Sequence, residues 1–390
     1  MGSGIGRLRL YNFRNYASLE MELGPGLNVL VGENAQGKSN LLEAVATLAL
    51  TRSPRAGSPA ELLRWGSEEA AVDAELMGPA GSEKLGLRLR RQGGAVAGVP
   101  ADASRGRIVR ASLLADRPVP ARTILGRCPV ILFWPDDLQL VKAGPDARRR
   151  QLDTLLCQLD VLAADELARY RRVLEQRNAL LRRLGESAGD HGELGAFDEA
   201  LVRHGARVQA ARRRLVRGLA PLAAAAMTSL SGGRDELQLR YRAHGEPETD
   251  GGSDDEEEIA RRLAEALRAR RAEELGRGIT LVGPHRDDLE YLVDGRAARS
   301  TASQGQQRTA VLAAKLAELR YARERSRRLP LLLLDDVLSE LDPRRGAQLL
   351  GSLDEEGDLL QTLITSTDQP ALGSRAARRF VVRHGMVTGL

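Results

Sequence analysis

The stretch Gly32-Glu33-Asn34-Ala35-Gln36-Gly37-Lys38-Ser39 decides the fold of this 390-residue chain. It follows the stretch Asn28-Val29-Leu30-Val31, which predicts a strand, and precedes Leu41 to Leu50, whose apolar residues recur at helical spacing. Two glycines spaced in this way and followed by Lys-Ser are typical of a phosphate-binding loop. In such a loop backbone N–H groups hold phosphates, the lysine neutralises the outer phosphates and the hydroxyl binds Mg²⁺. The stretch therefore predicts a nucleotide site at a helix N-terminus.

A second element, Leu331-Leu332-Leu333-Leu334-Asp335-Asp336, is an apolar run that ends in two carboxylates. Alone it is compatible with an ordinary core strand and a turn. Beside a phosphate loop it indicates a buried parallel strand with acids at its carboxyl end, where open α/β sheets hold their ligands. We expect Asp335 to join Ser39 in binding Mg²⁺, and Asp336 to orient or deprotonate the attacking water. Lys38, Asp335 and Asp336 are the candidate catalytic residues.

Two further elements flank this strand. Ser303-Gln304-Gly305-Gln306-Gln307-Arg308 precedes the apolar helical pattern Ala310 to Leu319, and Ser339-Glu340-Leu341-Asp342 follows the acidic pair. Either alone is typical of a helix cap or a turn. Together they resemble the signature motif and D-loop of the ABC-type ATPase superfamily. That resemblance implies that they act across a dimer interface, donating hydroxyl and N–H groups to the γ-phosphate held by the other protomer.

The composition is that of an ordinary folded protein, with 42% hydrophobic and 28% charged residues and a net charge of +5. No apolar run is long enough to span a bilayer and no N-terminal leader pattern is present, so we expect no membrane contact and a cytoplasmic protein. The two cysteines, Cys128 and Cys157, are far apart, and no histidines have metal-ligand spacing. A disulfide framework and a transition-metal site are disfavoured.

The pattern along the chain predicts a head interrupted by an arm. We assign residues 1–143 to the first part of the head, residues 144–276 to a helical arm and residues 277–390 to the rest of the head. Within the first part, residues 51–127 are expected to form irregular strands and loops. Amphipathic helical patterns cover 147–184, 196–230 and 259–275. The acidic segment Gly245 to Glu258 favours a solvated loop that caps the next helix over a metal site. The predicted fold class is α/β: an ABC-type ATPase head, a P-loop NTPase of two lobes, with an inserted α-helical arm.

Six motifs, in order, also make the chain similar to the RecF family of bacterial DNA replication and repair proteins, over residues 7 to about 370. They are Tyr11 to Tyr16; Gly32 to Ser39; Pro135 to Leu138 with Gly144-Pro145 and Arg148 to Arg150; Gly283 to Leu289; Ser303 to Arg308; and Leu331 to Asp342.

The RecF resemblance implies ATP and Mg²⁺ as cofactors and an ATP-dependent homodimer with slow, DNA-stimulated hydrolysis. It implies binding to duplex DNA and to single-strand/duplex junctions at gaps, cooperation with RecR and RecO in loading RecA, and support of the SOS response. The residues it places around the nucleotide are Gly32, Glu33, Asn34, Ala35, Gln36, Gly37, Lys38, Ser39, Arg14, Ser303, Gly305 and Gln306.

Three other classes share parts of this pattern. An SMC-like or Rad50-like tethering ATPase would carry a much longer insertion than the roughly 130 residues between the two head segments. A transporter ATPase would carry a switch histidine where this chain has Thr365-Ser366-Thr367-Asp368. A nucleoside kinase does not explain the presence of the Ser303 motif.

Two predictions concern other charged residues. Arg148, Arg149, Arg150, Arg171 and Arg172 could form a phosphate-binding face, and the alternative is a solvated amphipathic helix. His285 and Arg286 are compatible with a catalytic acid-base group, but we favour a structural or interlobe role, because phosphoryl transfer already has its Mg²⁺ ligands and a carboxylate.

Overall fold

A computed structural model of the chain describes residues 4–78, 81–92, 107–185, 192–244, 252–326, 328–339, 341, 343–355, 360–367 and 377–389. The chain forms two compact units, one made of Met1–Asp137 with Ala322–Leu390 and the other of Leu138–Tyr321. Within the described ranges, no helix is long and apolar enough to cross a membrane.

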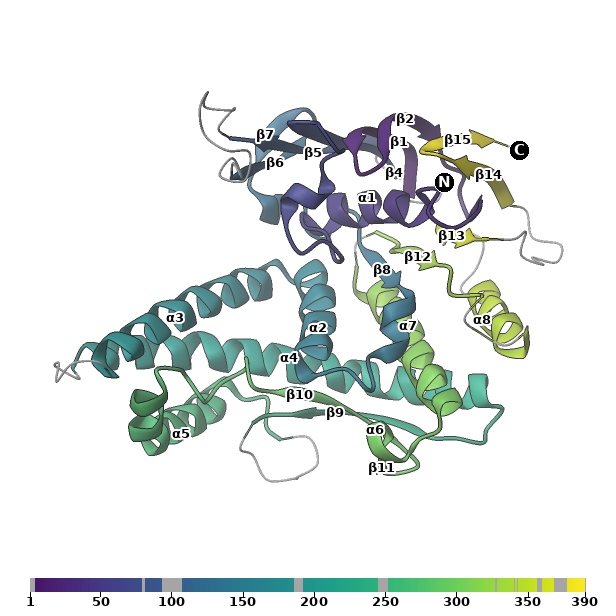
Figure 1. Cartoon of the computed structure of the whole chain (residues 1–390). Coiled ribbons are helices and arrows are strands. Elements are labelled where there is room, and N and C mark those ends of the chain that lie inside the picture. Colours follow the sequence, from purple (N-terminus) through teal and green to yellow (C-terminus); the bar gives the residue numbers. More distant parts are fainter. Residues whose placement is uncertain are drawn as a thin grey trace. The chain divides into compact units, whose positions relative to one another are not determined.

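The first unit contains an antiparallel sheet with strand order β2-β1-β4-β5-β6-β7 (Figure 1). Residues 51–127 supply four of its strands, so this region is more regular than the sequence indicated. The reason is that β4 alternates buried and partly exposed residues along most of its length, and β5 does so around its buried Leu85, Leu87 and Leu89. This is the pattern of half-buried strands, which the intervening Gly residues obscure. The strands are β1 (Gly4–Phe13), β2 (Tyr16–Glu22), β4 (Glu69–Gly78), β5 (Gly81–Arg91), β6 (Ile108–Leu114) and β7 (Arg117–Val119).

A second sheet of the first unit has the order β15-β14-β3-β13-β12-β8 and is parallel except for its edge strand β15. The phosphate loop follows β3 and the acidic pair ends β12, with β13 paired between these two strands. The carboxyl ends of β3, β13 and β12 therefore meet at one edge of the sheet. The strands are β3 (Leu27–Val31), β8 (Val130–Phe133), β12 (Leu331–Asp335), β13 (Thr362–Ser366), β14 (Ala377–Arg383) and β15 (Met386–Gly389).

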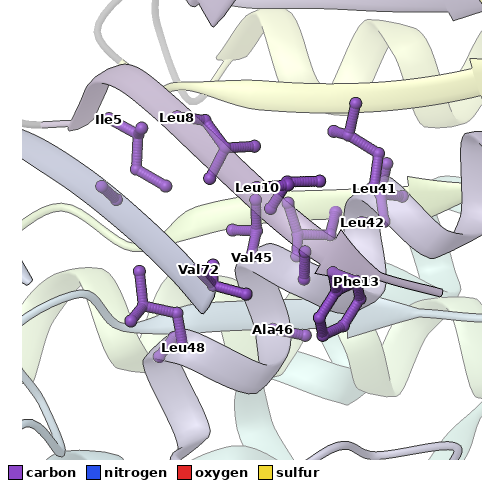
Figure 2. Packing of buried hydrophobic residues seen from close by; sticks show 14 of the residues in the cluster. Ile5, Leu8, Leu10, Phe13, Leu41, Leu42, Val45, Ala46, Leu48 and Val72 are labelled. Carbon is purple, nitrogen blue, oxygen red and sulfur yellow. The ribbon is translucent and has the colours of Figure 1, made fainter. Parts of the chain in front are cut away.

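Helix α1 (Lys38–Leu50) packs in the hydrophobic core between these two sheets. Apart from Ser39 and Asn40, every residue of α1 is buried, which explains why it is apolar on all faces. Figure 2 shows Leu41, Leu42 and Val45 of α1 packed against Leu8 and Leu10 of β1. Helix α8 (Pro343–Glu355) and the short 3₁₀ turns η1 (Pro59–Leu62) and η3 (Ala121–Thr123) complete the unit, and η4 (Pro135–Gln139) leads out of it.

The second unit is mainly helical. Its long helices α3 and α4 lie side by side (Figure 1), and α5 packs on α4 through Ile259 and Leu263. Its helices are α2 (Pro145–Leu159), α3 (Val161–Gly185), α4 (Glu193–Ser231), α5 (Glu256–Arg277), α6 (Ala298–Thr301) and α7 (Gln304–Arg325), whose last four residues belong to the first unit. The predicted continuous pattern 147–184 is two helices, because the Asp160 carboxylate accepts hydrogen bonds from the N–H groups of Leu162 and Ala163 and starts α3 anew.

The second unit extends beyond the predicted arm, 144–276. Its small sheet, with the order β11-β10-β9, pairs β9 (Leu237–Arg242) with β10 (Asp288–Val293) and β10 with β11 (Arg296–Ala297). This pairing keeps residues 277–321, which we had assigned to the head, with the helices. Sequence alternation indicates a strand but not the sheet to which it belongs.

Candidate nucleotide site

The predicted phosphate loop and acidic pair line one cavity of about 270 Å³ in the first unit. The lining residues are Asn34, Ala35, Gly37, Lys38, Ser39, Asn40, Arg55, Asp335 and Asp336. Residues almost 300 positions apart meet here because β12 is separated from β3 by a single strand. The helix N-terminus adds to the site: no described side chain caps α1 at Gly37, so first-turn N–H groups are available to an anion.

Ser39 and Asp335 are held together by hydrogen bonds. The Ser39 hydroxyl donates to Asp335 Oδ1 at 2.8 Å, and the Thr365 hydroxyl donates to the same oxygen at 2.8 Å. Hydroxyl and carboxylate oxygens are the ligands that Mg²⁺ prefers, and it usually takes only one or two carboxylates beside phosphate oxygens and water. The pair therefore fits a magnesium ion without rearrangement of the backbone.

Asp336 has unusual geometry for an acidic residue at a strand end. Its φ is 50°, in the left-handed region, and its N–H donates to the Thr365 hydroxyl at 2.8 Å. Its Oδ1 atom is buried and has no hydrogen-bond partner among the described residues. A buried carboxylate oxygen without a partner is costly, and Asp336 is one of the residues that line the cavity. The arrangement fits a carboxylate that binds a water or ligand atom.

Lys38 is buried and its Nζ atom donates to the Glu33 carbonyl at 2.8 Å and to the Gly32 carbonyl. Burial lowers the pKa of Lys38, and the nearby carboxylates of Asp336 and Asp335 oppose that shift. A cation placed close to two carboxylates and to a helix N-terminus can exchange its carbonyl partners for phosphate oxygens.

Two turns of the first unit brace the phosphate loop. The Asn15 side chain donates to the Gln36 carbonyl at 3.0 Å, and the Gly385 N–H donates to the same carbonyl at 3.1 Å. A Cβ atom on Gly32 would lie 2.3 Å from the Val382 carbonyl oxygen, so Gly32 is needed where the loop passes β14. Gly37 has φ 115°, a conformation that side chains disfavour. The glycines thus serve packing and backbone shape as well as phosphate approach.

Arg14 makes a buried ion pair. Its Nε and Nη2 atoms donate to the Glu43 carboxylate at 2.9 and 2.8 Å, and the Glu43 side chain is 1% exposed. This pair ties the β1–β2 turn to α1, next to the phosphate loop. The nucleotide contact that the family resemblance implies for Arg14 stays a prediction.

Ser303, Gly305 and Gln306 lie in the second unit, at the start of α7. The Ser303 N–H donates to Gln306 Oε1 at 2.9 Å and the Gln306 N–H donates to Ser303 Oγ at 3.2 Å, which is a capping box. Ser303 is exposed. The cap and a contact in trans are compatible, because the capped serine presents its hydroxyl at an exposed helix N-terminus. In the D-loop, Glu340 and Asp342 lie outside the described residues, as does Asp368 after β13.

The cavity also contains a residue that sequence reasoning missed. Arg55 lines it, and its guanidinium lies 5.3 Å from the centre of the Trp134 ring, a cation–π contact that can hold an exposed arginine in place. No motif marks Arg55, since it lies in an irregular loop after α1. Thr365 could have been found from its position at the end of a parallel strand beside β12.

Two other family motifs meet in the second unit and are structural. Arg148 is 3% exposed and donates from Nε and Nη2 to the two carboxylate oxygens of Asp288, each at 2.8 Å. Arg149 donates to the Asp287 carbonyl, and Arg171 pairs with Asp153 at 3.0 Å. Arg148 is therefore excluded from the expected phosphate-binding face, because buried charges are retained only when paired.

Asp287 and His285 are part of the same buried network. Gln209 Nε2 donates to Asp287 Oδ2 at 2.7 Å, the Tyr241 hydroxyl donates to the same oxygen, and burial raises the pKa of Asp287. His285 Nε2 lies 3.1 Å from the Thr280 carbonyl and Nδ1 lies 2.6 Å from the Tyr170 hydroxyl. A carbonyl only accepts, so Nε2 carries the proton and Nδ1 accepts from Tyr170. A neutral, mostly buried imidazole of this kind is consistent with the expected structural role.

A pH prediction follows from this histidine. Burial lowers the pKa of His285 to about 4, and the charges of Arg286, Arg149 and Arg212 add to the shift. An unfolded histidine has a pKa of about 6.5, so between pH 6.5 and 4 the unfolded chain binds a proton that the folded chain does not. Folding stability is therefore lost as pH falls through this window, by on the order of 2–3 kcal/mol from this residue.

We expect His285→Gln to lose less stability than the wild type between pH 7 and pH 5 in urea unfolding followed by circular dichroism. The matched control is His244→Gln, because the His244 side chain belongs to the same unit and is exposed. Equal pH dependence in the wild type and His285→Gln would contradict the assignment.

The parallel sheet, the braced phosphate loop and the acidic pair define the class of protein: a P-loop ATPase with an ABC-type head and an inserted helical arm. The family model described as AAA domain matches residues 7–96. The DNA replication and repair protein RecF of Symbiobacterium thermophilum is 42% identical over 98% of this chain and 97% of its own. RecF of a Synechococcus strain is 43% identical over 92% of this chain and 90% of its own. The chain belongs to the RecF family.

Solved structures agree with this assignment. The recombination mediator protein RecF of the RecFOR pathway, solved with ATPrS, superposes with a TM-score of 0.86 at 29% identity, covering 100% of this chain and 98% of that one. The Smc head domain of Pyrococcus furiosus superposes with a TM-score of 0.55 at 15% identity, covering 100% and 96%, which shows a shared fold only. The RecF resemblance and the predicted fold class are confirmed.

Proposed function

We propose that this protein is an ATP-dependent DNA-binding protein of recombinational repair and replication maintenance. The observation that carries the proposal is the cavity that Lys38, Ser39, Asp335 and Asp336 share. Lys38 and the α1 N-terminus would bind the outer phosphates of ATP, and Ser39 and Asp335 would hold Mg²⁺, which neutralises phosphate charge. Asp336 would orient the attacking water through its unpartnered oxygen.

Hydrolysis would act as a switch. The cavity of about 270 Å³ is smaller than the roughly 300–1,000 Å³ of pockets that enclose a whole ligand. This size supports a site that is completed by other residues, which we take to be Ser303, Gly305 and Gln306 of a second copy of the chain. ATP would then promote dimerisation, and its slow, DNA-stimulated hydrolysis would separate the protomers.

The biological setting follows from the family. RecF proteins are named for DNA replication and repair, and one is described as a recombination mediator of the RecFOR pathway. By this relationship we propose that the dimer acts in the cytoplasm on duplex DNA and on single-strand/duplex junctions at gaps. There it would work with RecR and RecO in loading RecA and support the SOS response.

An SMC-like or Rad50-like tether is the alternative, and the fold shared with the Smc head is compatible with it. The longest described helix, α4, has 39 residues and is about 58 Å long at 1.5 Å per residue. The described helices of the arm thus offer no long coiled coil, which supports the ATP-dependent DNA-binding dimer over the tether.

The proposed dimer is tested by sedimentation velocity with and without ATP and gapped DNA. We expect the wild type to dimerise only with ATP, and Ser303→Arg to bind ATP yet stay monomeric, because a bulky cation replaces the hydroxyl offered to the partner's phosphate. Ser300→Arg is the matched control, since Ser300 is also exposed and lies just upstream in α6. An ATP-dependent Ser303→Arg dimer would refute the role in trans.

A further inference from the structure

Four arginines form an exposed stripe on α4. Between Leu201 and Leu219 the only exposed residues are Arg203, Arg207, Arg214 and Arg217, which we call the arginine stripe. At 3.6 residues per turn they lie within about 80° of one another around the helix axis and extend over roughly 21 Å. No acidic residue occurs in α4 between Arg203 and Arg217, so the stripe depends on other elements for its counter-charges.

One of those counter-charges comes from α3, where Glu166 accepts a hydrogen bond from Arg207 at 3.0 Å, and the others come from the start of α5. Residues 254–258 are five consecutive carboxylates. Asp255 caps α5, accepting hydrogen bonds from the N–H groups of Glu257 and Glu258 at 2.8 and 3.0 Å. A cap of this helix was predicted for the acidic segment 245–258, of which residues 245–251 lie outside the described part. Capping needs one carboxylate. Among the described residues no group of acids is arranged to hold a metal ion.

Asp254 and Glu256 face the arginine stripe. Arg217 donates to Asp254 at 2.8 Å, while the nearest Glu256 oxygens lie 3.6 Å from Arg214 and 3.8 Å from Arg207. The two contacts of Glu256 are too long for hydrogen bonds. Asp254 therefore makes a hydrogen-bonded ion pair with the stripe, whereas Glu256 makes only loose contacts with it.

A groove of about 610 Å³ lies between the two helices and keeps the stripe accessible. Arg203 and Arg207 line its α4 side, and Glu256 and Glu257 line its α5 side. The side chains that form ion pairs between the stripe and the start of α5 are open to solvent: Arg214 is 51% exposed, Arg217 is 60% exposed and Glu256 is 46% exposed. Exposed ion pairs of this kind contribute little to stability, so another polyanion can displace the carboxylates.

We propose that the arginine stripe binds the phosphate backbone of duplex DNA, and that Asp254 and Glu256 compete with DNA for the same guanidinium groups. This inference rests on the proposed DNA-binding function and adds the place of contact and an autoinhibitory element. A stripe of roughly 21 Å matches about six phosphates of one strand, which follow one another every 3.4 Å along the axis. Backbone contacts carry no sequence information, so the stripe binds without sequence preference.

The test is the double variant Asp254→Asn/Glu256→Gln, which removes the competing charges and leaves the Asp255 cap in place. We expect it to bind a blunt DNA duplex in the presence of ATP about 3- to 10-fold more tightly than the full-length wild type, measured by fluorescence anisotropy. In the wild type, DNA displaces these carboxylates from the arginines, and the freed carboxylates take up cations from solution. The variant lacks these carboxylates, so its slope of log affinity against log salt concentration should be steeper by about one to two. The melting temperature checks that the variant folds.

The matched control is Glu265→Gln/Glu273→Gln, which removes two exposed acids farther along the same helix. An equal gain in the control would show a net-charge effect only and would overturn the proposal. Adding Arg203→Gln/Arg217→Gln to the acid-neutralised variant should cancel its gain, and a gain that persists would also overturn it. An acid-neutralised variant that binds DNA with wild-type affinity would overturn the proposal as well. If no form of the protein binds DNA, the proposed function fails together with this inference.

Discussion

We expect Lys38→Met to lose ATP binding by about 10- to 100-fold, and with it ATP-dependent retention on DNA. Methionine keeps the length and volume of the side chain but removes the charge that would pair with the outer phosphates. A charge-assisted contact with phosphate contributes about 1.5–3 kcal/mol, and each 1.4 kcal/mol is a factor of ten in affinity. Equilibrium titration with a fluorescent ATP analogue measures the loss.

The same variant should not melt earlier than the wild type. Burial lowers the pKa of Lys38, which means that the folded state bears a desolvation cost for this charge that methionine avoids. Lys84→Met is the control, because Lys84 belongs to the same unit and pairs with Asp116 at the surface. Wild-type ATP affinity in Lys38→Met would reject the assignment of the phosphate loop as the nucleotide site.

Asp336→Asn should uncouple ATP binding from hydrolysis. Asp336 lines the cavity and its Oδ1 atom has no hydrogen-bond partner in the described structure, so we take its carboxylate to be the group that accepts a proton from, or orients, the attacking water. Loss of such a group typically costs a factor of about 10² to 10⁴ in rate. We expect turnover to fall by that factor while ATP affinity is kept and the ATP-bound dimer accumulates on a sizing column.

A variant of Asp335 distinguishes the role of its carboxylate from that of the Asp336 carboxylate. Asp335 accepts hydrogen bonds from Ser39 and Thr365, so Asp335→Asn should weaken Mg²⁺-dependent ATP binding itself. Identical behaviour of the two variants would show that the acids do not divide metal binding and water activation between them. An ATP-insensitive monomer for Asp336→Asn would argue against the switch.

Most of the candidate site could be predicted from sequence because its motifs are local. A glycine loop between a strand and a helix, and an apolar run ending in two acids, each specify their own geometry within a few residues. Arg55 and the bracing turns of Asn15 and Gly385 could not be predicted, since their contact with the loop depends on how distant segments pack. The spacing of residues along the chain does not indicate which distant segments pack together.

The exposure of the arginines and the boundaries of the two units also depend on how distant segments pack, so the sequence did not predict them fully. Arg148 looked like a surface cation on an amphipathic helix, but its partner, Asp288, lies 140 positions away. Whether an arginine meets solvent or a carboxylate is decided by long-range pairing, which a helical period cannot encode. For that reason Arg148 is buried, whereas Arg150, Arg171 and Arg172 are exposed, as is the arginine stripe of α4.

The sequence by itself determined the phosphate loop, the acidic strand end, the class of fold and the family, because short-range spacing and backbone preference are written in consecutive residues. Only the tertiary structure decided which sheet each strand joins, which charges are buried, and that the acids of α5 face the arginines of α4. These features arise from contacts between remote segments, and their free energy depends on burial and distance, which exist only once the chain has folded.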